Sequence, residues 1–251
     1  MVSFMKKTLT LITLLFLGVS VLQAQTVPRD PQVIRAPDVP APKYGPDGKV
    51  SPTFLAMHER FLSIAKEGKV GLLFLGDSIT AGWGSMEDIW YRSFGRYKPA
   101  NFGVSGDRTQ HVLWRIQQGE LEGIQPRVIV LMIGTNNTGA DSATGIAKGI
   151  TAIVGTLREK QPKAKILLLG ILPRGKKASS NPYRDKINQA NDIISRLHDG
   201  KRIHYLDIGN HFLLTDGSIS AEIMPDYLHP SVAGYQIWAD AIAPKLTELM
   251  R

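Results

Sequence analysis

Apolar residues recur along the chain in two alternating patterns, one typical of strands and one typical of helices. Short continuous apolar runs predict buried strands at 70–75, 100–102, 128–133, 166–169 and 203–206. Apolar residues spaced three or four positions apart predict helices at 54–65, 110–118, 146–157, 187–197 and 231–249. Because strands and helices alternate, we expect an α/β fold in which helices cover both faces of a parallel sheet.

The N-terminal region differs from this pattern and predicts export. Lys6 and Lys7 precede an uncharged, leucine-rich stretch at 8–21, and Ala24 offers a small residue for cleavage. The stretch is shorter than the roughly 20 residues that a spanning helix needs, so we interpret residues 1–24 as a cleaved signal peptide. Cleavage near Ala24 would release the protein to the periplasm or the extracellular space. Residues 26–52 hold seven of the 15 prolines, which predicts an extended arm or linker over 25–52 without chemistry of its own.

Composition narrows the function classes further. The 251 residues carry a formal charge of +8, but the lysines and arginines are scattered, which is typical of a solvated surface. No nucleic-acid-binding motif is present, although a non-specific anionic-polymer binder stays open on charge alone. The chain has no cysteine, which excludes disulfides, thiolate nucleophiles and cysteine-ligated zinc. Its histidines lack metal-ligand spacing, so we expect neither a metal nor an organic cofactor.

Four short polar stretches carry the candidate chemistry, and three of them follow predicted strands. They are Gly76–Ser78, Gly103–Asp107, Gly134–Asn137 and Asp226–His229. Ligands in parallel α/β folds bind at the carboxyl ends of strands, so we expect the first three stretches to lie together. Ser78 is a candidate nucleophile, although Thr80 replaces the second glycine of the Gly-x-Ser-x-Gly elbow. The alternative is a serine that merely caps a helix.

The other stretches supply partners that a serine nucleophile needs. Asp226 lies three residues before His229, so its carboxylate can reach the ring Nδ1 and orient the base. Gly106 can bring a backbone N–H close to a developing oxyanion, and Asn136 can add its side-chain amide. The alternatives are a surface turn holding an incidental Asp–His pair and ordinary turns at strand ends.

Read together, the four stretches resemble the SGNH superfamily, also called GDSL hydrolases. The superfamily is named for a serine, a glycine, an asparagine and a histidine in that chain order. In this sequence they correspond to Ser78, Gly106, Asn136 and His229, and Asp226 completes a triad. The resemblance spans about residues 54–249 and implies a hydrolase domain over 53–251. It implies a flavodoxin-like three-layer α/β/α sandwich with a five-stranded parallel sheet. The resemblance also implies an oxyanion hole formed by Ser78, Gly106 and Asn136.

This sequence resembles one branch of the superfamily more than the others. Blocks at 101–107, 109–115, 134–137, 172–175 and 226–229 resemble the catalytic subunits of intracellular platelet-activating-factor acetylhydrolase. Ser105 departs from that branch, which has a second glycine there. The predicted export and the proline-rich arm also argue against the cytosolic regulatory partner of that branch.

We therefore expect an exported serine esterase that hydrolyses short-chain, acetyl esters through an acyl-enzyme, with carbohydrates as candidate alcohols. Ile79, Thr135 and Leu228 flank the catalytic residues and are candidates to shape the acyl pocket; Trp83 and Trp114 are candidates to line the cleft. The partner is then an ester of a small molecule or a polysaccharide, with no nucleic acid and no stable membrane anchor. A homodimer stays open. Alternative functions are a lysophospholipase or thioesterase of the same fold and a non-catalytic secreted carbohydrate-binding protein.

Overall fold

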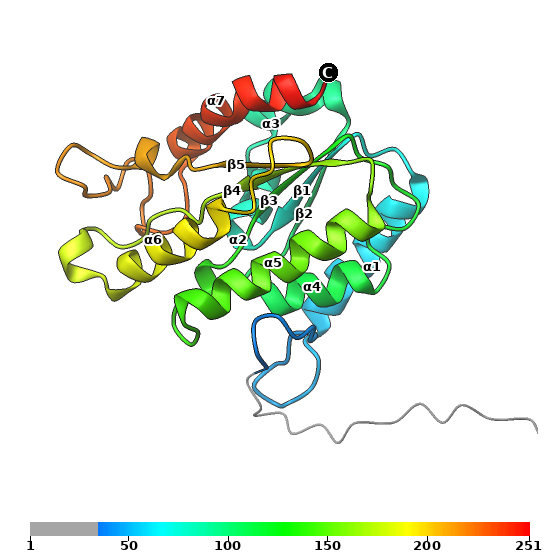
Figure 1. Ribbon diagram of the computed structural model, residues 1–251, viewed down its shortest axis with the longest axis horizontal. Coiled ribbons are helices and arrows are strands. Elements are labelled where there is room, and N and C mark those ends of the chain that lie inside the picture. Colours follow the sequence, from blue (N-terminus) through cyan, green and yellow to red (C-terminus); the bar gives the residue numbers. More distant parts are fainter. Residues whose placement is uncertain (1–34) are drawn as a thin grey trace, which may run out of the picture. The chain divides into compact units, whose positions relative to one another are not determined.

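A five-stranded parallel sheet forms the centre of the structure, a computed structural model that describes residues 35–251 (Figure 1). The predicted signal peptide lies outside the described residues. The sheet order is β2-β1-β3-β4-β5, and every neighbouring pair is parallel. The strands are β1 (Leu72–Gly76), β2 (Pro99–Gly103), β3 (Val128–Met132), β4 (Lys165–Leu169) and β5 (Ile203–Leu206). This arrangement confirms the predicted α/β class and its five-stranded parallel sheet.

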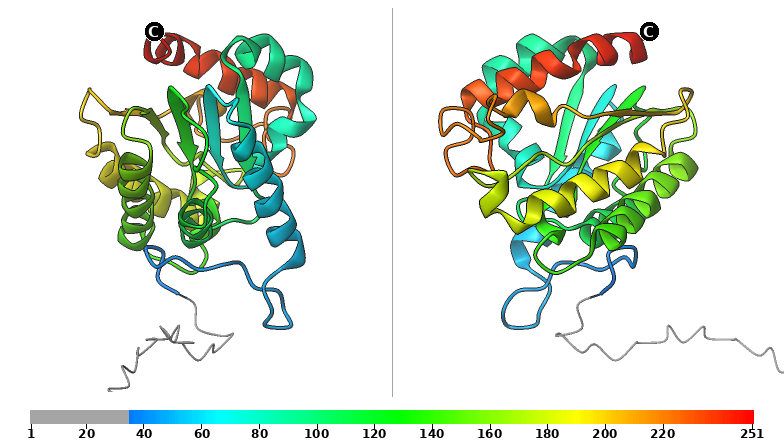
Figure 2. Two further views of the ribbon diagram at one scale, coloured as in Figure 1. Left: turned by 90° about the vertical axis from the view of Figure 1, so that its right-hand side faces the viewer. Right: turned by 60° about the vertical axis from the view of Figure 1, so that its left-hand side comes forward.

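Helices cover both faces of the sheet and create two separate cores (Figure 2). One face packs against α1 (Pro52–Glu67), α4 (Thr109–Gln117), α5 (Ala143–Lys160) and α6 (Pro182–Ser195). The opposite face packs against α3 (Glu87–Phe94) and α7 (Val232–Leu249). Both faces of the central strands are therefore buried, which explains why β1 and β3 read as continuous apolar runs rather than alternating ones.

Helix caps account for the boundaries that the apolar pattern leaves open. Ser51 and Ser231 accept backbone N–H groups at the starts of α1 and α7, and Gly68 ends α1 in a left-handed conformation. The start of α6 differs from its expected position at 187. Asn181 caps the helix and Pro182 occupies its first turn, so α6 begins five residues earlier.

The short helix α3 was not predicted, and it changes the expected place of one tryptophan. Ile89, Trp90 and Phe94 of α3 are buried against the sheet. Trp90 and Phe94 form an aromatic cluster with Trp83, whose ring centroid lies 5.6 Å from that of Trp90. Trp83 is only 1% exposed, so the expectation that it lines the cleft is wrong. Trp114 is partly buried and packs against Phe54 of α1.

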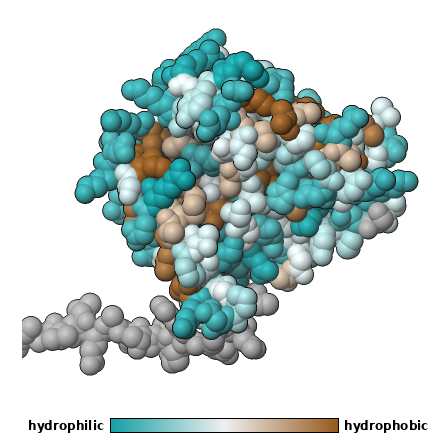
Figure 3. Space-filling view, turned by 180° about the vertical axis from the view of Figure 1, so that it is seen from behind, coloured by the Kyte–Doolittle hydropathy of each residue, from teal (hydrophilic) through white to brown (hydrophobic). Residues whose placement is uncertain are grey.

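The surface mixes polar and apolar groups in small areas (Figure 3). Much of any folded surface is apolar, so scattered apolar groups need no partner to explain them. Among residues 35–251, no helix combines the length and the apolar character that a bilayer crossing requires.

Candidate active site

Close backbone packing brings Ser78 to the carboxyl end of β1. Ser78 opens the short helix α2 (Ser78–Ala81), and the Asp77 carboxylate caps that helix by accepting the Ile79 N–H at 3.0 Å. A side chain at Gly76 would collide with Thr80 and with the backbone of β3. Glycine at position 76 therefore allows the turn after β1 to fold tightly enough to present the serine at the sheet edge.

The Ser78 hydroxyl lies beside the His229 ring, although 151 positions separate them in sequence. Ser78 Oγ is 2.9 Å from His229 Nε2, and His229 Nδ1 is 2.6 Å from Asp226 Oδ2. His229 comes from the loop between β5 and α7, so the contact depends on the whole sheet being assembled. The order hydroxyl, imidazole, carboxylate is the geometry that activates a serine by proton transfer.

A strained turn holds the Asp226 carboxylate against the imidazole. Its Oδ1 accepts the backbone N–H groups of Leu228 at 3.0 Å and His229 at 2.7 Å. Tyr227, between them, adopts a left-handed conformation with φ of 56°, which is unusual for a residue with a side chain. Partial burial raises the pKa of Asp226, but these bonds and the one from the ring outweigh it, and the net pKa is lowered. The carboxylate therefore stays charged beside the ring.

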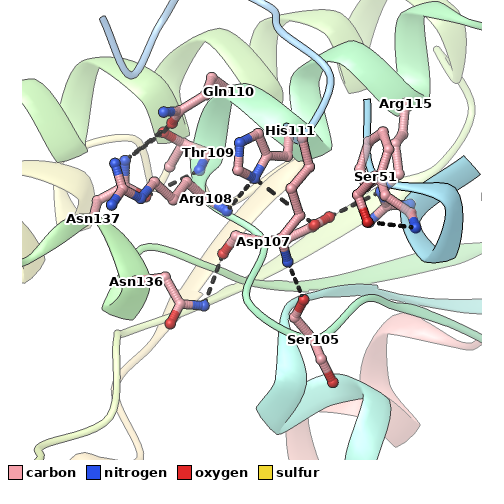
Figure 4. Close-up of polar contacts among 12 residues, drawn as sticks. Ser51, Ser105, Asp107, Arg108, Thr109, Gln110, His111, Arg115, Asn136 and Asn137 are labelled. Atoms are coloured by element: carbon pink, nitrogen blue, oxygen red, sulfur yellow. Dashed lines mark hydrogen bonds and ion pairs between the residues drawn. The ribbon is translucent and has the colours of Figure 1, made fainter. Parts of the chain in front are cut away.

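The loop after β2 supplies the candidate oxyanion donors. Gly106 has φ of 72°, a conformation that favours glycine, and Asn136 Nδ2 donates to the Asp107 carbonyl at 2.9 Å (Figure 4). Among residues 35–251, no protein acceptor is in hydrogen-bond geometry with the backbone N–H of Ser78 or Gly106. Both N–H groups are therefore available to a ligand.

Asn137, which the sequence did not single out, connects the Asn136 loop to α4. Its buried side chain accepts the Thr109 N–H at 3.0 Å and donates to Gln110 Oε1 at 3.1 Å (Figure 4). This amide joins the turn after β3 to the start of α4, immediately after the Gly106 loop. It consequently fixes the relative position of the two candidate oxyanion segments.

A buried charged cluster lies beneath the Gly106 loop. Arg115 is fully buried; it donates to Asp107 Oδ2 at 2.9 Å and also forms an ion pair with Glu120. The Oε1 atom of Glu120 is within hydrogen-bond distance of His58 Nδ1, at 2.8 Å. Burial raises the pKa of Asp107 to about 6, although Arg115 opposes that shift. The cluster was not predicted, because its members come from separate elements and match no motif.

Asp77 is a second buried carboxyl close to the site. It is 2% exposed, and burial raises its pKa to about 7 despite the hydrogen bond from the Ile79 N–H. Desolvation disfavours the charged form, and no arginine or lysine forms an ion pair with this carboxyl in residues 35–251. Asp77 therefore gains a proton at a pH where an exposed carboxyl would remain ionised.

The three candidate acyl-pocket residues differ in exposure. Ile79 and Thr135 are each 2% exposed, whereas Leu228 is half-buried. Ile79 packs in the core between the sheet and α7, and its carbonyl accepts the Tyr235 hydroxyl at 2.6 Å. The Thr135 hydroxyl is buried, and residues 35–251 offer it no hydrogen-bond partner. Their role in an acyl pocket stays a prediction.

Comparison with known sequences identifies relatives over most of the chain. Residues 74–237 match the model of the GDSL-like lipase/acylhydrolase family. Human platelet-activating factor acetylhydrolase IB subunit alpha1 is 40% identical over 200 residues, covering 78% of this chain and 84% of the relative. The rat alpha2 subunit is 42% identical over 183 residues, covering 72% of this chain and 78% of the relative.

Solved structures share the fold at lower identity. A GDSL-like lipase from Bacteroides thetaiotaomicron superposes with a TM-score of 0.62 at 20% identity, covering 76% of this chain and 97% of the other. A variant of a Geobacillus acetyl-xylooligosaccharide esterase superposes with a TM-score of 0.57 at 19% identity, covering 72% and 96%. These similarities show a common three-layer architecture.

Proposed function

The chain belongs to the GDSL-like lipase/acylhydrolase family and is an ester hydrolase, and from that premise we propose that Ser78, His229 and Asp226 form its catalytic triad. The observation that carries this proposal is the pair of contacts joining the three side chains, 2.9 Å from Ser78 Oγ to the ring and 2.6 Å from the ring to Asp226. A hydroxyl, an imidazole and a carboxylate in this order are the parts that covalent ester hydrolysis needs.

The reaction proceeds in two steps. Ser78 Oγ attacks the ester carbonyl carbon while His229 Nε2 takes the hydroxyl proton, and Asp226 stabilises the resulting imidazolium. The tetrahedral oxyanion accepts hydrogen bonds from the backbone N–H groups of Ser78 and Gly106 and from the Asn136 amide. The imidazolium then protonates the departing alkoxide and leaves an acyl-serine. Water, deprotonated by the same ring, attacks that ester; the imidazolium then returns the proton to Ser78 Oγ as the acid departs. Neither step requires a metal or an organic cofactor.

The decisive experiment compares Ser78→Ala with wild type on p-nitrophenyl acetate. We expect kcat to fall by about 10⁴-fold or more, because the acyl-enzyme cannot form. Ser63→Ala is the matched control, since Ser63 is exposed on α1 and its hydroxyl donates only to the Glu59 carbonyl. Activity that survives Ser78→Ala unchanged would exclude this serine as the nucleophile.

The substrate is proposed to be a short-chain, acetyl ester, with a carbohydrate as one candidate alcohol. The names of the curated relatives, which are acetylhydrolase subunits, support a small acyl group. Rates on acetyl, butyryl and octanoyl esters of one alcohol test the idea. A preference for octanoyl would favour the lysophospholipase or thioesterase alternative.

Export is also proposed, on the evidence of the N-terminal sequence. Lys6 and Lys7, the uncharged stretch at 8–21 and Ala24 support a cleaved signal peptide. Mass spectrometry of the protein recovered from a secreting bacterial host tests this directly. A mature N-terminus near Gln25 is the expected result, and recovery of the uncleaved chain from the cytosol would contradict it.

A further inference from the structure

The arm that precedes the hydrolase domain contacts the loop that carries Gly106. The Lys43 ammonium group donates to the Ser105 carbonyl oxygen, where a dashed line ends in Figure 4. A Cβ added at Gly106 would lie 2.7 Å from Lys43 Nζ, so the ammonium sits directly against this peptide. The arm, which was predicted to have no chemistry of its own, therefore contacts a candidate oxyanion segment.

Lys43 is held in place from both sides. Before it, the Pro37 carbonyl accepts the Thr109 hydroxyl at 2.8 Å, and the Ala41 N–H donates to the Gln110 carbonyl at 3.1 Å. After it, the Lys43 carbonyl accepts the Ser51 N–H at 2.7 Å. Residues 37–51 of the arm are thus fixed to the first turn of α4 and to the N-cap of α1. A flexible surface lysine would lack these attachments.

The environment of the ammonium group makes this contact unusual. Burial lowers the pKa of Lys43, and Arg108 and Arg115 lower it further while Asp107 opposes them. Lys43 forms no salt bridge in the part of the chain from 35 to 251. The structure therefore places a half-buried cation against a backbone carbonyl rather than against a carboxylate.

The bonded carbonyl and the candidate oxyanion donor belong to one peptide unit. In a planar trans peptide the C=O and N–H bonds point in opposite directions. Holding the Ser105 carbonyl from one side consequently aims the Gly106 N–H to the other side. A cation on the carbonyl oxygen also polarises the amide and makes its N–H a stronger donor.

We propose that Lys43 is a positioning residue whose ammonium group orients and polarises the Ser105–Gly106 peptide, so that the Gly106 N–H is directed at the oxyanion of the transition state. This inference rests on the proposed function, in which Gly106 is an oxyanion donor. It assigns the proline-rich arm to the catalytic apparatus. Lys43 does not touch the reacting atoms and acts only through this peptide.

The test compares Lys43→Met with Lys43→Arg and with the control Lys49→Met, using p-nitrophenyl acetate. Methionine keeps the apolar stem and removes the donor, while a cavity of about 280 Å³ beside Lys43 leaves room for arginine. Lys49 is exposed on the same arm. Losing an oxyanion donor typically costs 10²–10³ in kcat, so a misdirected donor should cost about 10- to 100-fold with little change in KM. Lys43→Arg should restore most of the rate, and Lys49→Met should match wild type.

A transition-state mimic separates this role from a merely structural one. A trifluoromethyl ketone adds Ser78 Oγ to its carbonyl and develops an oxyanion, whereas the corresponding methyl ketone binds mainly as the free ketone. Lys43→Met should weaken the trifluoromethyl ketone by a factor similar to its loss in kcat/KM and leave the methyl ketone unchanged. A structural defect would weaken both inhibitors alike, which would overturn the proposal.

The outcomes also distinguish this inference from the proposed function. If Ser78→Ala is inactive but Lys43→Met matches Lys49→Met, the triad stands and the role of Lys43 is refuted. If Ser78→Ala retains full activity, the proposed function itself fails. Should Lys43→Met not fold, Lys43→Gln takes its place, because it removes the positive charge and shortens the side chain by one atom. A kcat equal to wild type in that variant would likewise refute the proposal.

Discussion

Replacing Asp77 with asparagine tests the cost of a buried carboxyl next to the proposed nucleophile. Asp77 caps α2 through Oδ1, which accepts the Ile79 N–H at 3.0 Å. Asparagine has an oxygen at the same position and is an equally good N-cap residue, so Asp77→Asn keeps this bond. What it removes is the ionisation of a side chain that is only 2% exposed.

The magnitude follows from the raised pKa. Burial moves the pKa of Asp77 from 3.8 to about 7, so between these values the folded protein holds a proton that the unfolded chain releases. The free energy of unfolding therefore falls as the pH rises through this window. Below the window this group does not change the stability, and above pH 7 the loss of stability is complete. At 1.36 kcal/mol for each pKa unit, the loss approaches about 4 kcal/mol. The asparagine side chain does not ionise, so the Asp77→Asn variant does not show this loss of stability.

The assay is urea unfolding of both proteins at about pH 4, 6 and 8. We expect similar stabilities near pH 4 and a variant that is more stable by up to about 4 kcal/mol near pH 8. Asp47→Asn is the matched control, because the Asp47 carboxylate is exposed and also accepts a backbone N–H, that of Lys49. A difference between Asp77→Asn and wild type that stays constant with pH, or that grows toward low pH, would refute the reasoning.

Two further substitutions test the proposed triad and the buried cluster. Asp226→Asn should lower kcat on p-nitrophenyl acetate by up to about 10⁴-fold, because an amide cannot hold the His229 tautomer or stabilise its cation; a loss under twofold would contradict the triad. Arg115→Met should lower the free energy of unfolding by about 3–5 kcal/mol in urea titrations, since it leaves two carboxyls buried without their cation. Arg158→Met, which breaks an exposed ion pair, should cost at most about 1 kcal/mol, and equal effects would contradict this account.

The central architecture was predictable because burial leaves a direct signature in the chain. Strands buried on both faces must be apolar throughout, which is why the runs around Leu73, Val130 and Leu167 marked the sheet. The helix α3 escaped prediction because it is eight residues long and mixes aromatic with charged positions. Its place is decided by Trp83 and the other rings that it packs against, which no local pattern records.

The candidate triad was visible in sequence only as separate fragments. The local pair of Asp226 and His229 could be anticipated, because three residues of a turn bring their side chains together. The contact from His229 to Ser78 could be inferred only through a family resemblance, since it closes a loop of 151 positions.

Patterns along the chain settled the strand and helix order, the fold class and the residue types available for ester hydrolysis, because these depend on neighbours within a few positions. Only the folded structure brought the Lys43 ammonium to the Ser105 carbonyl and enclosed Arg115 between two carboxylates. Such contacts join segments whose distance in space is set by packing across the whole sheet. Electrostatic interactions depend on that distance and on burial, and neither quantity is encoded in any one stretch of residues.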